Sequence, residues 1–272
     1  MSLRIQNNIE AFDAHRALAA TTDKLSKSME RLSSGYRINR AADDSAGLAI
    51  SEKLRAQIGG LAQAQRNAQD AVSMVQTAEG SLAEVHSMLQ RVRDLAVQFN
   101  NGTLSSSDQA SITLEVTQLC NEIARIGSQT KFNGIALLTG SNTITFQIGA
   151  NDNETITVNL MSLFGTGSSV DVDSGIFNFS GTVVLQSIDD AIDKVSTARS
   201  TFGAVQNRIE HTLNNLASYQ ENLTASESRI RDVDMASEMV EFTKDQILQQ
   251  AGTSMLAQAN TLPQSVLTLL RG

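Results

Sequence analysis

Proline, cysteine and aromatic residues are scarce in this sequence of 272 residues. It has one proline, one cysteine, no tryptophan, two tyrosines and nine phenylalanines. Because proline interrupts helix interiors, its absence before Pro263 leaves room for very long helices. The same scarcity argues against a disulfide scaffold and against an all-β sandwich with proline-rich turns. A core must then be built from Leu, Ile, Val, Ala and Met, as in helical bundles and coiled coils.

Positive charge is also in short supply, since the formal net charge is −8 and the pI is about 4.9. Nucleic-acid binders usually carry a basic balance, so no nucleic-acid partner is expected. Residues 1–40 carry seven Lys and Arg against four Asp and Glu, whereas residues 227–245 carry three against six. These net charges of +3 and −3 favour a position of the two ends near each other. Neither a signal peptide nor a long apolar run is visible, so no membrane insertion is expected.

The second half of the chain has the clearest helical period. An apolar residue stands at every seventh position from Ile188 to Ile230, which predicts one long helix of coiled-coil character. The second seam position is weaker, because it includes Thr212, Tyr219 and Ser226. This weakness suggests packing against several partners and not one clean dimer seam.

A matching helix is predicted in the first half, where apolar residues follow steps of three and four from Leu54 to Phe99. The steps Val72–Val75–Ala78 are both three and predict a slip in the heptad phase. A third helix is expected after it, capped by Ser107 or Asp108 and ended by Gly127.

Residues 126–188 have a different composition, with eight of the 17 glycines and only five charged residues. Residues 142–149 and 154–160 alternate apolar and polar side chains around turn-forming residues 150–153. This pattern predicts a β-hairpin, with irregular or β structure continuing to about residue 184.

The composition of the two ends is typical of helices that are buried against other helices. Residues 246–270 contain no charged side chain, yet glutamines and asparagines interrupt their apolar positions. A helix without charge is usually covered on most sides, and one other terminal helix cannot cover it alone. Copies of the same chain would supply the rest, and the ends would be largely unfolded in a free monomer. The predicted self-assembly residues are Ile5, Ile9, Phe12, Leu18, Leu25, Leu32, Leu248, Met255, Leu262, Val266 and Leu269.

Patterns for catalysis or metal binding are missing from the sequence. The three histidines are widely separated, and no phosphate-binding loop, dinucleotide fingerprint or serine-nucleophile motif occurs. Cys120 follows Leu119 on a predicted helix and reads as a small buried apolar residue. Asp43 and Asp44 read as caps for a helix that starts near Ser45. No enzyme activity, cofactor or metal is expected.

Several long motifs resemble those of bacterial flagellins. The first half contains RLSSGYRINRAADDSAGLAISE from Arg31, RNAQDA from Arg66 and QTAEGSL from Gln76. The second half contains ENLTASESRIRDVDMA from Glu221, and the stretch from Ile247 to Arg271 resembles the flagellin C-terminus. The resemblance implies a mainly α fold, a long coiled-coil-like bundle with a small β-hairpin region, in a discontinuous two-domain arrangement.

Domain limits follow from the same resemblance. Terminal helices in residues 1–34 and 235–272 would form the inner filament core domain, and residues 35–46 the spoke linker. Residues 47–234 would form an outer helical domain with a β-hairpin region at about 131–185. The protein would be an extracellular subunit that polymerises into the flagellar filament for motility. The alternative is a hook–filament junction adaptor, which caps a filament and does not extend it.

Partners are implied by the resemblance as well. They are a homopolymer of the chain, the flagellar cap protein, hook–filament junction proteins and a flagellin secretion chaperone, with export through the flagellar type III apparatus. Residues 89–98 also resemble the flagellin segment that vertebrate Toll-like receptor 5 recognises. The implied receptor contacts are Gln90, Arg91, Arg93, Leu95, Gln98 and Glu115, although Leu119 stands where receptor-activating relatives often carry Arg. Packing between subunits is the competing role for these residues.

Overall fold

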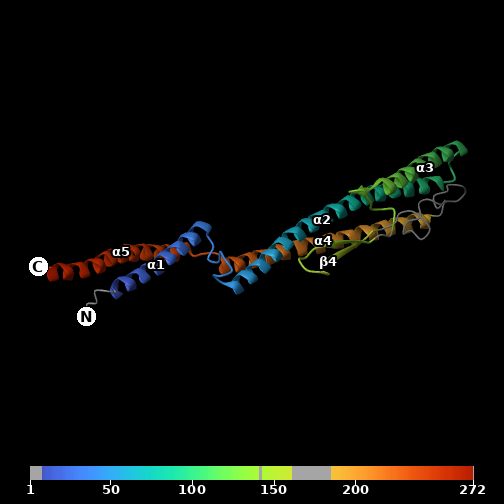
Figure 1. Cartoon of the computed structure of the whole chain (residues 1–272). Coiled ribbons are helices and arrows are strands. Elements are labelled where there is room, and N and C mark those ends of the chain that lie inside the picture. The colour runs from blue at the N-terminus through green and yellow to red at the C-terminus, as the bar shows by residue number, and fades with distance from the viewer. Residues whose placement is uncertain (1–7, 141–142, 161–184, 272) are drawn as a thin grey trace. The chain divides into compact units, whose positions relative to one another are not determined.

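The computed structural model describes residues 8–140, 143–160 and 185–271, with the backbone alone for 262–271. Helices dominate it, as the composition predicts, and the expected mainly α class is confirmed (Figure 1). The helices are α1 (Ile9–Ser34), α2 (Ser45–Phe99), α3 (Ser106–Gln129), α4 (Leu185–Arg231) and α5 (Met235–Arg271). The strands are β1 (Lys131–Phe132), β2 (Ile135–Ala136), β3 (Thr143–Gln147) and β4 (Thr155–Asn159).

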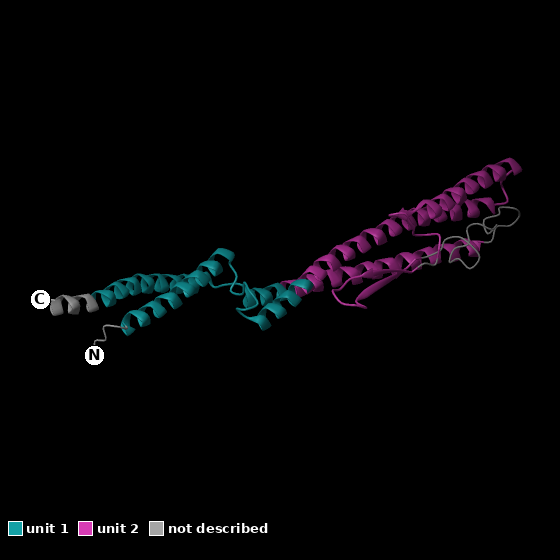
Figure 2. Ribbon diagram, in the orientation of Figure 1, with its two compact units in different colours: residues 1–56, 222–272 teal, residues 57–221 magenta. Residues whose placement is uncertain are grey.

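The chain forms two compact units (Figure 2). Unit 1 comprises residues 1–56 and 222–272, and unit 2 comprises residues 57–221. The limits fall inside α2 and α4, not at the ends of these helices. Both hydrophobic clusters of buried side chains lie in unit 2. The assignment of these segments to an inner and an outer filament domain stays a prediction.

The seam of α2 is regular, so the predicted phase slip is wrong. One buried seam of α2 alternates steps of three and four without interruption, through Ala64, Ala68, Ala71, Val75, Ala78, Leu82, Val85, Leu89, Val92, Ala96 and Phe99. Met74 and Leu95 are buried beside this seam. Ala71, not Val72, occupies the seam position, and Val72 is only half-buried. Size alone favours Val72 over the adjacent Ala71 as the seam residue, which produces the apparent slip, although Ala71 is the buried one.

The predicted caps of α3 are corrected by its hydrogen bonds. Ser105 is the N-cap, and its hydroxyl accepts a hydrogen bond from the Asp108 N–H. The Asp108 carboxylate in turn accepts from the Ser105 N–H. The Ser105 hydroxyl also donates to Asp108 at 2.6 Å, which holds the pKa of that carboxyl below its ordinary value. Gly127 does not end the helix. It is buried within the helix, which continues to Gln129.

The predicted hairpin is confirmed. Strands β3 and β4 pair antiparallel in the register Thr143↔Asn159 and Gln147↔Thr155. Ile156 and Val158 of β4 are buried in the first hydrophobic cluster, so one face of the hairpin covers the helices. The stretch 161–184, where further β structure was expected, lies outside the described residues. A smaller hairpin, β1–β2, turns at Asn133 and Gly134, which both have positive φ as a two-residue hairpin turn requires.

Helix α4 packs against α2 along the positions predicted from the heptad pattern. Ile188, Val195, Phe202, Ile209 and Leu216 are buried, whereas Tyr219 of the weaker seam is 45% exposed. Two ion pairs join the helices, Arg93–Asp189 at 2.6 Å and Arg199–Glu79 at 3.1 Å. Unit 2 is therefore a helical bundle whose apolar core consists of two hydrophobic clusters.

Candidate self-assembly surface

The candidate self-assembly surface lies on the antiparallel pair of helices α1 and α5 in unit 1 (Figures 1 and 2). Asn8 at the start of α1 donates a side-chain hydrogen bond to the Ala259 carbonyl at 2.8 Å. Arg31, near the other end of α1, lies 3.6 Å from the Glu238 carboxylate. The opposite charges of the two ends thus meet, as their composition predicts.

The seam between α1 and α5 follows heptad spacing but mixes small and polar side chains with a few larger apolar ones. Among the described side chains of the two helices, only Ser28, Asp245 and Ala259 are buried. Half-buried residues fill the other seam positions: Ala11, Ala14, Leu18, Thr21 and Leu25 on α1, and Glu238, Phe242, Gln249, Gly252 and Leu256 on α5. The pair therefore lacks an apolar core comparable to that of unit 2, and burial within it contributes little stability.

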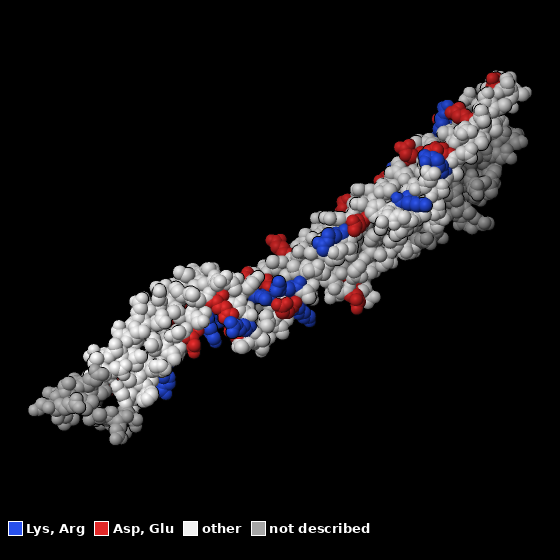
Figure 3. Space-filling model, turned by 45° about the horizontal axis from the view of Figure 1, so that its top comes forward, with Lys and Arg blue, Asp and Glu red and all other residues white. Residues whose placement is uncertain are grey.

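Apolar side chains lie on the outside of this pair. Of the fifteen large hydrophobic side chains exposed in the described part of the chain, nine belong to α1 and α5. They are Ile9, Phe12, Met29, Met235, Met239, Val240, Ile247, Leu248 and Met255. Phe12 is 70% exposed and Val240 is 68% exposed. On the face drawn in Figure 3, the end of unit 1 nearest the grey terminal residues shows few charges.

The exposed residues point in several directions around the pair. Val240 and Ile247 are seven residues apart and fall midway between seam positions of α5, so they point away from α1. Leu248 and Met255, by contrast, border a groove between the two helices with a volume of about 400 Å³. Ala14, Ala17, Leu18, Ala251 and Gly252 supply most of its remaining lining. A covering partner must therefore contact more than one side of the pair.

Gly252 makes this groove possible. A Cβ atom placed there would lie 3.2 Å from Leu18 Cδ1, closer than ordinary van der Waals contact. The glycine lets α1 approach α5 at this point, and a larger residue would push Leu18 aside and fill the groove.

The described self-assembly candidates divide into two groups. Ile9, Phe12, Leu248 and Met255 are exposed, whereas Leu18, Leu25 and Leu32 are half-buried. Ile5 and the side chains of Leu262, Val266 and Leu269 lie outside the described residues. Sequence reasoning passed over Met29, Met235, Met239, Val240 and Ile247 as assembly candidates, and it passed over the polar seam positions. A heptad search that admitted polar residues would have found the seam.

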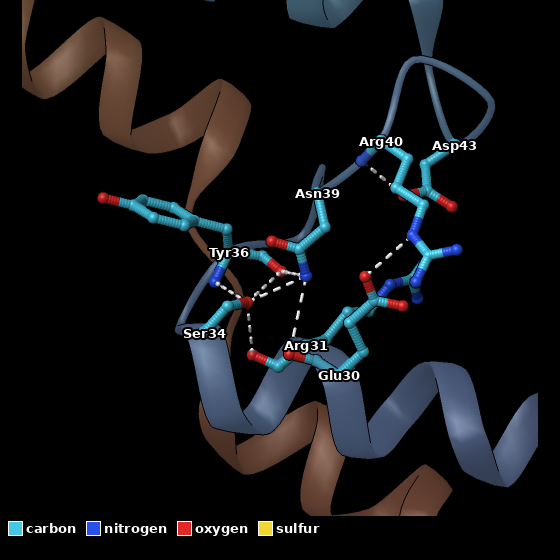
Figure 4. Close-up of polar contacts among 7 residues, drawn as sticks. All are labelled: Glu30, Arg31, Ser34, Tyr36, Asn39, Arg40 and Asp43. Atoms are coloured by element: carbon cyan, nitrogen blue, oxygen red, sulfur yellow. Dashed lines mark hydrogen bonds and ion pairs between the residues drawn. The ribbon is translucent and has the colours of Figure 1, made fainter.

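The spoke segment after α1 is held by a polar network (Figure 4). Gly35 ends α1 with a φ of +75°, and its N–H donates to the Arg31 carbonyl. The Asn39 amide donates to the Ser34 hydroxyl at 2.8 Å, and Arg40 donates to the Glu30 carboxylate at 3.0 Å. These bonds fold the spoke back onto the last turn of α1.

Of the two aspartates at the end of the spoke, Asp44 has the capping role that the sequence predicts, whereas Asp43 accepts a hydrogen bond within the spoke. The Arg40 N–H donates to Asp43 at 3.0 Å, and this bond holds the pKa of Asp43 below its ordinary value. Asp44 accepts from the Gly47 N–H at 2.8 Å and so caps α2, which begins at Ser45. Each carboxylate thus accepts a backbone N–H near the start of α2.

Arg231, the last residue of α4, contacts both the spoke and α2. Its guanidinium lies 5.0 Å from the centre of the Tyr36 ring and 2.5 Å from the Glu52 carboxylate. The hydrogen bond from Arg231 lowers the pKa of Glu52. The backbone adds a bridge between Tyr36 and Asp232, with the Arg37 N–H donating to the Arg231 carbonyl at 2.7 Å. The spoke and the connection between α4 and α5 are therefore joined by backbone and side-chain contacts.

The predicted receptor contacts lie in unit 2 and are only partly at the surface. Arg91 pairs with Glu115 of α3 at 2.7 Å, and Arg93 pairs with Asp189 of α4. Leu95 is 2% exposed and packs in the second hydrophobic cluster, so its side chain is withdrawn from any surface partner. Its inclusion is corrected because it falls on the same buried face of α2 as Val92 and Phe99. Gln90 and Gln98 are exposed.

No group of three metal-ligating side chains occurs in the part of the chain that the structure describes. None of the described helices combines the length and the hydropathy of a membrane-crossing segment. Cys120 is half-buried beside the second cluster, and burial raises the pKa of its thiol to about 11. A protonated, half-buried thiol is a poor nucleophile.

Comparison with known proteins assigns the family. Residues 5–143 match the model of the bacterial flagellin N-terminal helical region, and residues 185–270 match that of the bacterial flagellin C-terminal helical region. The chain belongs to the bacterial flagellin family. This flagellin is a structural, non-enzymatic subunit of the flagellar filament and is located in the flagellum.

The relatives of this flagellin match it along nearly its whole length. It is 51% identical to a flagellin of Halalkalibacterium halodurans over 98% of this chain and 99% of the relative. It is 47% identical to a flagellin of Bacillus subtilis, over 99% of this chain and 100% of the relative. A flagellar filament 33 kDa core protein of Treponema phagedenis is also 47% identical, over 98% of this chain and 99% of the relative. These relatives support the filament subunit over the junction adaptor.

A solved structure shares the fold. The structure of a putative flagellar hook-associated protein from Vibrio parahaemolyticus superposes with a TM-score of 0.61. It covers 70% of this flagellin and 100% of that chain at 17% identity, a likeness that concerns the fold alone.

Proposed function

We propose that the α1/α5 pair is the surface through which copies of this flagellin join into the filament. The observation that carries the proposal is the concentration of exposed apolar side chains on two helices that share no apolar core. Full burial of one such side chain contributes about 1.5–3 kcal/mol. Neighbouring copies would supply that burial, and the groove beside Leu248 and Met255 would receive a neighbour's side chains.

The proposal also assigns the units. Unit 1 would form the inner filament core, with residues 35–46 as its spoke, and unit 2 the outer part. In the structure α1 and α5 are paired helices, and the expectation that they unfold in a free monomer stays a prediction. Neighbouring copies would then complete the terminal pair when a subunit docks at the filament tip.

Single substitutions on the outer face test this assembly surface. Phe12→Ser and Val240→Ser should each raise the subunit concentration needed for growth from filament seeds roughly ten- to hundredfold, from the lost burial. Electron microscopy and sedimentation measure the growth. Gln246→Ser, an exposed polar position on α5, is the matched control and should grow like the parent. Parental growth of both apolar variants would contradict the proposal.

Further partners follow from the family resemblance alone. We propose that the cap protein, the hook–filament junction proteins and a secretion chaperone bind this flagellin, and that the type III apparatus exports it. Binding measurements with each purified protein test these partners.

The surface part of the receptor segment remains a proposal for Toll-like receptor 5. Gln90, Arg91, Gln98 and Glu115 are exposed and Arg93 is partly exposed, whereas Leu95 is excluded by its burial. Arg91→Ala should weaken receptor binding roughly tenfold, since it removes a charged contact. Surface plasmon resonance with the receptor ectodomain measures it, and unchanged binding would refute this assignment.

A further inference from the structure

Thioether side chains are concentrated on the same two helices. Of the eight methionines in the sequence, Met29, Met235, Met239 and Met255 are between 48% and 65% exposed. All four lie on α1 or α5 of unit 1. In unit 2, Met74 is 1% exposed and Met88 is half-buried against the first cluster. The described methionines are therefore exposed on the candidate assembly surface and covered in the stable core.

The local positions of these methionines suit contact with solvent oxidants and with a neighbouring copy. Met235 and Met239 are four residues apart on α5 and share one face of that helix. Met255 borders the groove between α5 and α1. Each of the four sulfurs belongs to an uncharged side chain that, under the proposed function, becomes buried when a subunit joins the filament.

We propose that these four methionines are oxidation sites that switch off incorporation of the free subunit. The oxidant is a peroxide such as hydrogen peroxide. A lone pair of the thioether sulfur attacks one peroxide oxygen, and the O–O bond breaks. The proton on the attacked oxygen passes to the leaving hydroxide, which departs as water. The sulfur is oxidised by two electrons to a sulfoxide and the peroxide is reduced by two.

The chemical change acts on assembly through burial. A sulfoxide oxygen is a polar acceptor, and its burial without a hydrogen-bond donor is unfavourable. The exposed side chains tolerate the change in the free subunit, where water solvates the new oxygen. Only the docked state is penalised, so oxidation should block growth without unfolding unit 2. This inference rests on the proposed role of α1 and α5 in assembly.

The experiment begins with the full-length subunit and hydrogen peroxide. Peptide mass spectrometry gives the sulfoxide occupancy at each methionine, and seeded growth is followed by electron microscopy. We expect the four exposed methionines to oxidise at least about fivefold faster than Met74, because oxidation follows exposure. Growth should fall as these sulfoxides form, and the same four residues should oxidise more slowly in finished filaments. Equal oxidation rates in subunit and filament would count against the inference.

Leucine variants test whether the loss of growth comes from oxidation of the four exposed methionines. A variant with M29L, M235L, M239L and M255L nearly conserves side-chain volume and should grow after peroxide treatment at its untreated rate. M74L is the matched control and should stay as sensitive as the parent. Loss of growth by the peroxide-treated fourfold variant would place the effect elsewhere, for instance at Met1 or Met161, and would overturn the proposal.

Reduction of the sulfoxides gives a test that needs no substitution. Methionine sulfoxide reductases applied to the oxidised parent should restore growth in proportion to the thioethers recovered. Normal growth of a parent carrying all four sulfoxides, or no recovery after their reduction, would overturn the inference while leaving the assembly surface in place. Parental growth of Phe12→Ser and Val240→Ser would instead contradict the proposed surface itself, so the two failures are distinguishable.

Discussion

A chain that ends at Gln246 is expected to lose seeded filament growth completely while unit 2 stays folded. The truncation removes the part of α5 that lies against the first half of α1, including Gly252 opposite Leu18 and the Ala259 carbonyl that accepts from Asn8. It also removes the exposed side chains of Ile247, Leu248 and Met255. Both the pairing of the terminal helices and the surface proposed to meet neighbouring copies would be lost together.

Unit 2 should not respond to this truncation, because every residue of its two hydrophobic clusters lies between positions 68 and 209. Circular dichroism should show helical structure that melts at the parental temperature, and electron microscopy should show no extension of seeds. The full-length variant Gln246→Ser controls for the local change at the new end. Robust filaments from the truncated chain would show that the distal part of α5 is not needed for assembly.

The retained charge pairs sharpen this expectation. Arg31 would still meet Glu238 after the truncation, and Arg231 would still meet Tyr36 and Glu52. The part of unit 1 near the spoke would therefore keep its bonds, although surface ion pairs contribute only about 0–1 kcal/mol each. Loss of growth would then be traced to the uncharged distal stretch and not to collapse of the spoke.

Sequence periodicity was sufficient to predict the long helices and the hairpin. Apolar residues at heptad spacing can be buried together only on a helix, and alternating residues around a Gly- and Asn-rich turn only on paired strands. The positions that failed are those where the apolar pattern is ambiguous. Ala71 and Val72 are adjacent and both apolar, so side-chain size favoured the wrong one. Leu95 was missed as a core residue although it falls on the buried face of α2.

The sequence predicts that the two ends take part in assembly, but it does not predict which of their side chains lie in the α1/α5 seam and which point outward. An uncharged stretch indicates covering by partners, yet it does not say which side chains face α1. The seam includes Asp245 and Gln249, which carry no apolar signal, while Val240 and Ile247 carry the signal and point outward. Tertiary pairing decided these positions, because the register of α1 against α5 determines which side chains enter the seam, whatever their polarity.

The second large effect expected is on the core of unit 2. Leu89 is fully buried in the first hydrophobic cluster. Leu89→Ala should destabilise unit 2 by about 2–5 kcal/mol and lower its melting temperature by about 5 to 15 °C. Differential scanning calorimetry measures the shift. A melting temperature within a degree or two of the parent would mean that this cluster does not stabilise the unit.

The comparison of Leu89→Ala with Val240→Ser separates stability from assembly. Val240 is exposed, so its replacement should leave the melting of unit 2 unchanged and impair only growth. Leu89→Ala should have the opposite pattern at temperatures where the variant remains folded, with lower melting but seeded growth intact. If Leu89→Ala stopped growth while folded, unit 2 would also control docking. If Val240→Ser lowered the melting temperature, its side chain would be part of the subunit's own core. Opposite effects on melting and on growth are expected because Leu89 is buried in the core of unit 2, whereas Val240 is exposed on the surface proposed to meet neighbouring copies.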